Sequence, residues 1–172
     1  MVVLIIIAIL LVIAIPIYAD VAETAEIAVM RYNGTYVVKV LALNIFDFEN
    51  EDRYDAPTAG DFNYSEDSMN NLLEKELEDY QANSNRDSIK NVKSRSLKIL
   101  HGDNPVGGSI ADGRNPAVFI TGNAAYSYTG GGSMDNLIGS IVAYFNQAAP
   151  YNVQVYYIDR DGVRGELLVN LD

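Results

Sequence analysis

The acidic turn near the C-terminus holds the residues best suited to bind a metal. Asp159, Asp161 and Gly162 match the start of a calcium-binding loop, in which spaced carboxylates and a glycine surround the ion. The third acidic position is occupied by Val163, and no glutamate closes the loop at the expected spacing. The sequence therefore favours a solvated turn, with Asp159 and Asp161 as weak candidate metal ligands.

Side chains suited to covalent or acid–base catalysis are scarce. The chain has no cysteine, and His101 is its single histidine. The glycine run Gly130–Gly132 is not followed by a phosphate-binding or dinucleotide-binding pattern, so it is interpreted as a connector. The many carboxylates share no recognisable catalytic spacing. We therefore expect neither enzyme activity nor a cofactor, and no disulfide can form.

Charge is distributed in two blocks of opposite sign within a chain of net charge −11. The acidic block comprises Asp47, Glu49, Glu51, Asp52, Asp55, Asp61, Glu66, Asp67, Glu74, Glu76, Glu78 and Asp79. The basic block comprises Arg86, Lys90, Lys93, Arg95 and Lys98. Such blocks are usually solvated faces. Alternatively, the acidic patch of one subunit faces the basic patch of its neighbour in a polymer. The acidity makes nucleic-acid binding by the globular part unexpected.

The elements that position these residues begin with an uncharged apolar run from Met1 to Ala19. As a helix it would be about 28 Å long, close to the thickness of a bilayer's hydrocarbon core. A signal peptide fits poorly, because no basic residue precedes the run and none occurs before Arg31. A simple membrane anchor would explain the run but not the helical pattern of the next thirty or so residues.

The apolar pattern continues beyond the run with helical spacing. The stripe consists of Ala22, Ala25, Ile27, Met30, Gly34, Val37, Leu41, Ile45 and Phe48. These steps of three and four residues predict one helix over 2–48, about 70 Å long. Pro16 should bend or locally melt this helix. Gly34 is either a second weak point or a place where the helix packs closely on a sheet.

The N-terminal region resembles the first helix of type IV pilins and pseudopilins. The resemblance rests on MVVLIIIAILLVIAIPIY, with its proline inside Ala14–Tyr18, and on the polar and small residues from Asp20 to Ala28. It covers residues 1–48 and is weak over the rest of the chain. It implies a pilin-like α+β fold: a protruding apolar half-helix, then an amphipathic half packed on a globular head.

The resemblance also implies that the apolar half-helix builds the core of a helical homopolymer. The corresponding assembly residues are Val3, Leu4, Ile7, Leu10, Leu11, Ala14, Pro16 and Tyr18. Family members usually begin with Phe-Thr-Leu-x-Glu-Leu, and alignment on Pro16 places Met1 at the seventh position of that pattern. Either the first six residues of the working subunit are missing here, or this subunit lacks the glutamate.

The expected domain organisation is a protruding helix over 1–24 and a globular head over 25–172. Within the head we expect the helix half 25–48, an acidic loop and helix over 49–116, and an antiparallel β-meander over 117–172. The acidic part divides into a loop over 49–64, a helix over 66–81 capped by Ser65, and an irregular segment over 82–116 with a short strand at 96–100.

The meander is expected to use strands at 117–121, 140–146, 152–158 and 166–171, with a hairpin turn at 159–162. Segment 140–146 is ambiguous. Its β-branched and aromatic residues favour a strand, whereas the spacing of apolar residues from Met134 to Phe145 also fits a helix capped by Ser133.

The resemblance implies one main expectation for function. The chain is expected to be a structural subunit, most simply the major one, of a type IV pilus used in adhesion, motility or aggregation. Its partners would be other copies of itself, the cytoplasmic membrane before assembly, and the pilus assembly machinery. It would then be exposed on the cell surface. A pseudopilin of a secretion or DNA-uptake system, and a membrane-anchored exported binding domain, are the alternatives.

Overall fold

The computed structural model describes residues 1–49, 89–103, 105, 115–146 and 153–171, with the backbone alone for 43–49. Glu49 apart, the acidic loop and helix predicted over 49–81 lie outside these residues. The same holds for 82–88, 104 and 106–114 of the predicted irregular segment.

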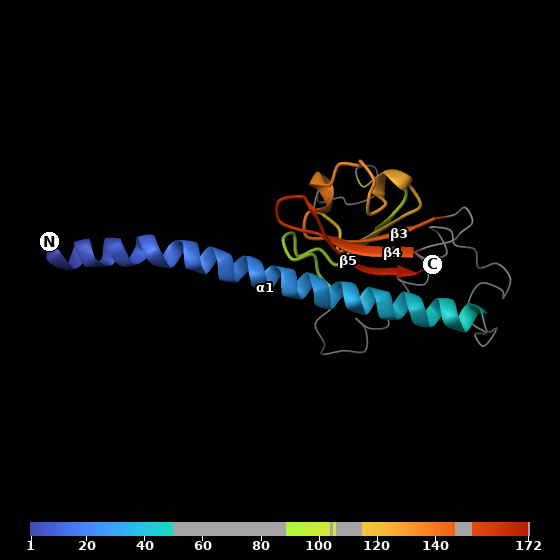
Figure 1. Cartoon of the computed structure of the whole chain (residues 1–172), viewed down its shortest axis with the longest axis horizontal. Helices are drawn as coiled ribbons and strands as arrows, with labels where there is room; N and C mark the ends of the chain where they lie inside the picture. The colour runs from blue at the N-terminus through green and yellow to red at the C-terminus, as the bar shows by residue number, and fades with distance from the viewer. Residues whose placement is uncertain (50–88, 104, 106–114, 147–152, 172) are drawn as a thin grey trace.

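One long helix, α1 (Val2–Glu49), begins the chain and runs past the head (Figure 1). It ends one residue beyond the predicted boundary. The helix is continuous through Pro16 and curves gently, so the local melting considered for this position does not occur in this structure. A proline removes one backbone hydrogen bond, and the turns on either side are sufficient to keep the helix intact.

The strands of the described chain form one five-stranded sheet in the order β1-β2-β3-β4-β5. The strands are β1 (Ile99–His101), β2 (Val118–Thr121), β3 (Ile141–Phe145), β4 (Val153–Ile158) and β5 (Arg164–Leu171). Every strand predicted from the sequence is present, with β1 displaced from the predicted 96–100. The predicted α+β class, a long N-terminal helix packed on a sheet, is therefore confirmed.

The pairing of the strands differs in part from an antiparallel meander. β3, β4 and β5 are antiparallel neighbours, and β4 and β5 form the predicted hairpin. β2, however, pairs in parallel with both β1 and β3. A parallel pair needs a crossover of about a dozen residues or more, and segment 122–140 between β2 and β3 provides that length. The sequence analysis interpreted the glycine run of this segment only as a connector, so it did not predict the crossover.

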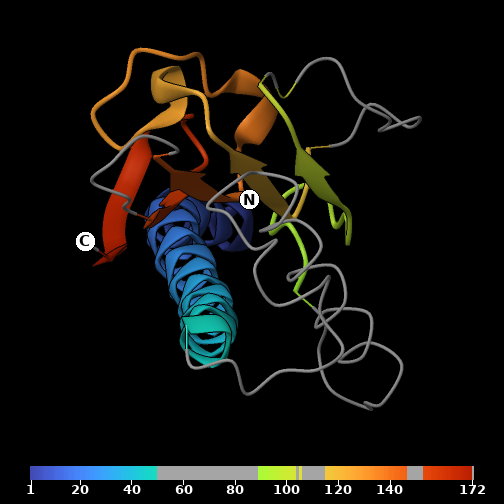
Figure 2. The same cartoon turned by 90° about the vertical axis from the view of Figure 1, so that its right-hand side faces the viewer.

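The sheet is covered on both faces, which gives the head three layers. α1 lies across one face of β3, β4 and β5, and the crossover segment 122–140 covers the other face (Figure 2). The crossover contains two short 3-10 helices, η1 (Ala124–Tyr126) and η2 (Asp135–Leu137).

Burial on both faces also explains the ambiguity at 140–146. Ile141, Ala143 and Phe145 pack in the cluster on the α1 side, whereas Val142 packs on the crossover side. A strand buried on both faces shows no polar alternation, so its apolar residues also satisfied helical spacing. The strand interpretation is confirmed.

The crossover is held to the sheet by aromatic residues. The ring of Tyr126 contacts Phe119 edge to face, with 5.4 Å between ring centroids. The hydroxyl of Tyr156 donates to the carbonyl of Tyr126 at 2.5 Å. Burial raises the pKa of Tyr156 to about 12, and the neighbouring Arg164 only partly offsets that rise. Tyr156 is therefore a neutral hydrogen-bond donor at all physiological pH values.

Gly34 lies where α1 packs closely on the sheet. A Cβ atom at this position would lie 2.0 Å from Cδ1 of Leu168 on β5 and 3.6 Å from Cδ1 of Ile141 on β3. The nearest obstacle is the end of a flexible side chain, so a methyl group would require Leu168 to move, and a longer side chain would require α1 itself to move. The close-packing interpretation of Gly34 is therefore the one that the structure supports.

Replacing Gly34 with leucine should loosen the head. Overpacking a well-filled interface costs roughly 1–3 kcal/mol, which exceeds the ~1 kcal/mol that a helix gains when it loses a glycine. We expect Gly34→Leu to lower the unfolding midpoint of the full-length protein in detergent, followed by near-ultraviolet circular dichroism of the tyrosines. Thr35→Leu on the exposed side of α1 is the control and should leave the midpoint unchanged. An unchanged midpoint in Gly34→Leu would contradict the close packing.

Candidate assembly surface

The apolar half of α1 has no partner within its own chain. All of residues 1–20 are exposed, and the most apolar window of the helix is entirely unburied. Leu4 is 71% exposed and Leu11 is 53% exposed, values normally seen for polar surface residues. A helix that is apolar on all sides is stable only when it is buried on all sides.

The structure places all eight predicted assembly residues on this exposed rod. Val3, Leu4, Ile7, Leu10, Leu11, Ala14, Pro16 and Tyr18 all lie on exposed helix. They are not set apart from their neighbours, because Ile5, Ile9 and Ile13 are between 56% and 57% exposed. The candidate surface is therefore the whole circumference of residues 1–19, and the sequence prediction named only a part of it.

Beyond Asp20 the same helix becomes amphipathic. The face packed on the sheet carries five of the stripe residues predicted from the sequence, together with Val40: Ile27, Met30, Gly34, Val37 and Leu41. Ala25 does not belong to this face, because it is exposed. The opposite side of the helix carries exposed apolar side chains that the sequence analysis missed, at Val21, Val29 and Tyr32.

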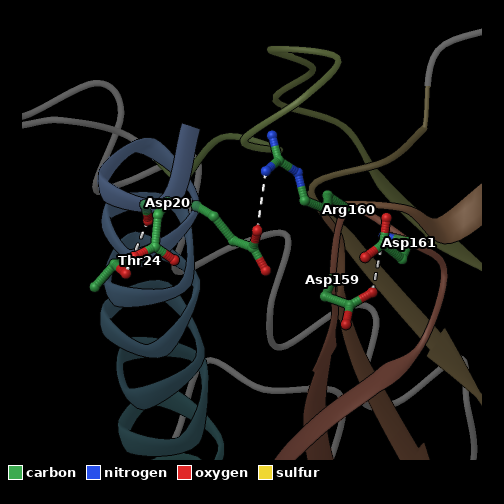
Figure 3. A network of polar contacts seen from close by, with 6 residues as sticks. Asp20, Thr24, Asp159, Arg160 and Asp161 are labelled. Carbon is green, nitrogen blue, oxygen red and sulfur yellow. Dashed lines mark hydrogen bonds and ion pairs between the residues drawn. The ribbon is translucent and has the colours of Figure 1, made fainter. Parts of the chain in front are cut away.

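An ion pair links the helix to the head near the point where the apolar rod ends. Nη1 of Arg160, on the β4–β5 turn, lies 3.1 Å from Oε2 of Glu23 (Figure 3). The hydrogen bond to Glu23 is the main cause of a raised pKa of Arg160. A second pair, Arg31 with Glu166 of β5 at 2.9 Å, lies further along the helix. Sequence reasoning did not find these pairs, because their members lie far apart in the chain.

The same turn shows what the weak candidate metal ligands do. Oδ1 of Asp159 accepts the backbone N–H group of Asp161 at 2.9 Å (Figure 3) and that of Val163 at 2.8 Å. Asp159 thus stabilises the turn by accepting backbone hydrogen bonds, as aspartate commonly does. These bonds occupy one of its two carboxylate oxygens. Among the residues that the structure describes, no group of three or more histidine, cysteine, aspartate or glutamate side chains could hold a metal ion.

Removing the Arg160–Glu23 pair should loosen the helix locally without unfolding the head. Exposed ion pairs contribute little to global stability, but this one joins α1 to the head nearer the rod than the Arg31–Glu166 pair does. We expect Arg160→Met to accelerate hydrogen exchange of the backbone amides near Glu23, measured by mass spectrometry. Added salt should have the same effect on the native protein and little on the variant.

Glu26→Gln, which removes a nearby carboxylate without breaking the pair, is the control. Unchanged exchange in Arg160→Met would show that the pair does not fasten the helix.

Comparison of the chain with protein-family models, with curated proteins and with solved structures finds no match. The structure itself supplies the remaining evidence. One helix near the N-terminus is long and apolar enough to cross a membrane, which is compatible with membrane anchoring. A long apolar N-terminal helix packed on a β-sheet is compatible with pilin-like architecture.

Proposed function

We propose that this chain is a structural subunit of a type IV pilus-like filament, and most simply its major subunit. In this proposal the apolar half of α1 crosses the cytoplasmic membrane before assembly and enters a bundle of identical helices afterwards. The head then forms the outer surface of the filament, where adhesion, motility or aggregation takes place. The observation that carries the proposal is that residues 1–20 are all exposed on a chain whose head is already covered on both faces of its sheet.

The energetics favour a bundle of helices as the final environment. Each large apolar side chain gains about 1.5–3 kcal/mol when it leaves water, so a bare rod cannot remain in solvent. Lipid and a helix bundle are similarly apolar, so side-chain packing decides between them. The rod is rich in isoleucine and valine, whose branched side chains have few rotamers and form stiff, shape-specific surfaces.

The coupling of helix and head supports the same proposal. Because α1 is one continuous helix packed on the sheet from Ile27 to Leu41, the position of the rod fixes the position of the head. A flexible linker after the apolar run would suit a domain that is only tethered to a membrane. A rigid joint suits a polymer in which packed rods set the spacing of the heads.

An acidic residue inside the rod should abolish filaments while leaving the head folded. We expect Ile7→Asp or Leu11→Asp to give no filaments in electron micrographs of material sheared from cells. The head should keep its native resistance to limited proteolysis, because residues 1–20 are exposed and do not pack in the two core clusters of the described head. Val163→Asp, a change of the same kind at a residue on the β4–β5 turn that is 57% exposed, is the control and should leave filaments intact. Normal filaments from both rod variants would refute burial of the rod in the filament.

Removing the rod should produce a soluble monomer. A chain that begins at residue 25 keeps the helix face packed on the sheet and loses the surface that requires cover. We expect this chain to sediment as a single monomeric species at micromolar concentration, without detergent. Polymers formed by this shortened chain would show that the head assembles through other surfaces.

Shearing also separates the proposal from its alternatives. Long filaments released by shear favour a pilus subunit over a pseudopilin, whose polymers are short. An exported domain that is only anchored would remain entirely in the membrane fraction, and no fibre would form.

A further inference from the structure

Apolar side chains remain exposed on α1 beyond the rod, beside the head. We call this row the outer seam; it consists of Tyr18, Val21, Ala25, Ala28, Val29 and Tyr32, all of which are exposed. Tyr18 is 77% exposed and Tyr32 is 67% exposed. Tyrosine is enriched in the buried centres of protein–protein interfaces, where it often contributes much of the binding energy. The outer seam therefore has the composition of a contact surface.

The outer seam lies on the side of α1 that faces away from the sheet. Seen along the helix, the sheet is on one side only, and Met30 and Val37 pack toward it (Figure 2). At 3.6 residues per turn, the seam residues project to the opposite side. The charged residues between Tyr18 and Tyr32 all project outside the seam by the same geometry; they are Asp20, Glu23, Glu26 and Arg31. The seam is thus an uncharged strip about 21 Å long.

The spacing of the seam suits packing against a second helix. The steps from Tyr18 through Val21, Ala25 and Ala28 to Tyr32 are alternately three and four residues. They average about 3.5 residues, the period at which two helices stay in contact over several turns. The same row continues without interruption into the rod, through Ala14, Leu11, Ile7 and Leu4. The surface that packs on other helices therefore does not end where the rod ends.

A bilayer that holds the rod cannot also cover the seam. The hydrocarbon core is about 30 Å thick, and residues 1–19 already span about 28 Å of it as a helix. Asp20, Glu23 and Arg31 lie on the same turns of α1 as the seam, and ionised side chains are costly to place in hydrocarbon. The seam thus needs a protein partner.

The described part of the head offers no apolar surface that matches the seam. Among the residues that the structure describes, Leu97 and Val163 are the only exposed large apolar side chains outside α1. The rod is apolar on all sides and, at about 28 Å, is long enough to cover the seam. Because α1 is one continuous helix, the rod cannot fold back on its own seam. The rod of a second copy of the chain is therefore the partner that fits.

We propose that the apolar rod of one subunit covers the outer seam of a neighbouring subunit. This inference rests on the proposed polymer function and adds the register between neighbours. In that function all rods leave the membrane in the same orientation, so the two helices are parallel. Residues 1–19 of one copy can lie beside Val21 to Tyr32 of the other only if the copies are offset by about 13–20 residues, or roughly 20–30 Å.

An offset contact of this kind produces an open polymer. Each subunit gives its rod to one neighbour and presents its seam to another, so two different surfaces meet. Contacts between different surfaces do not close into a dimer, and they continue as a helical filament when no ring forms. Large branched side chains of the rod would lie against the small residues Ala25 and Ala28, which permit close approach of the two helices.

Photo-cross-linking of sheared filaments tests the contact directly. We expect p-benzoylphenylalanine in place of Tyr32 to give a covalent dimer on irradiation, because this aromatic side chain inserts into C–H bonds that it touches. Trypsin cleaves after Arg31, the first basic residue, so the partner should appear as peptide 1–31. Fragmentation in the mass spectrometer should place the link within residues 1–19. The same probe in place of Val163, on the β4–β5 turn, is the control and should give no link to the rod.

A pair of glutamate variants tests the seam without the probe. We expect Ala25→Glu to lower the yield of filaments about tenfold or more, because it buries a charge under the neighbouring rod. Thr24→Glu is the matched control: this neighbouring residue is also exposed, but its side chain projects about 100° away around the helix. Its yield should stay within about twofold of the native value.

Three results would overturn the inference. One is a link from position 32 only to residues 20–35 of the neighbour, which would show helices packed without the offset. Another is no dimer, or a dimer linked only through the head, from filaments that carry the probe. The third is equal filament yields from Ala25→Glu and Thr24→Glu. Absence of filaments from the native chain would instead refute the proposed polymer, and so the two failures are distinguishable.

Discussion

The whole structure depends on one unsatisfied requirement: a rod of nineteen uncharged residues must be kept out of water. Nothing in the described chain covers it, and the most apolar window of the helix is completely unburied. The head does not share this deficiency, because α1 covers one face of its sheet and the crossover layer covers the other. The head therefore has a packed core on both faces of its sheet, whereas the described chain leaves the apolar rod exposed to water. Such a rod requires an apolar environment, of which a bilayer and a bundle of helices are two examples.

The same helix forms both the exposed rod and the face that packs on the sheet. The position of the rod therefore determines the position of the head. Close contact at Gly34 and the buried side chains from Met30 to Leu41 fix α1 on the sheet. The Arg160–Glu23 pair holds the helix near the end of the rod. Packing of rods against one another would consequently place the heads at defined intervals.

Much of this architecture could be predicted from the sequence, because the strongest signals in it are local. The uncharged run, the spacing of Ile27, Met30 and Val37, and the turn at 159–162 each identified an element that the structure confirms. The parallel pairing of β2 with β3 could not be predicted. It depends on how segment 122–140 packs across the sheet, through contacts such as that between Tyr126 and Phe119. Ion pairs between distant positions, such as Glu23 and Arg160, give no local signal. The hydrogen bonds that the side chain of Asn91 donates to the carbonyls of Pro116 and Ile138 could not be predicted either, since these partners lie 25 and 47 residues further along the chain.

The absence of cysteine from the chain permits a direct test of the central claim, that copies of the rod cover one another. Leu11→Cys and Val163→Cys each introduce a single thiol, one on the rod and one on the head. The measurement is the rate at which a water-soluble maleimide labels each thiol in purified filaments free of detergent and lipid. Burial of the rod among neighbouring rods predicts rapid labelling at position 163 and at least a hundredfold slower labelling at position 11, on the order of the protection that burial gives. Equal labelling rates at the two positions would contradict it.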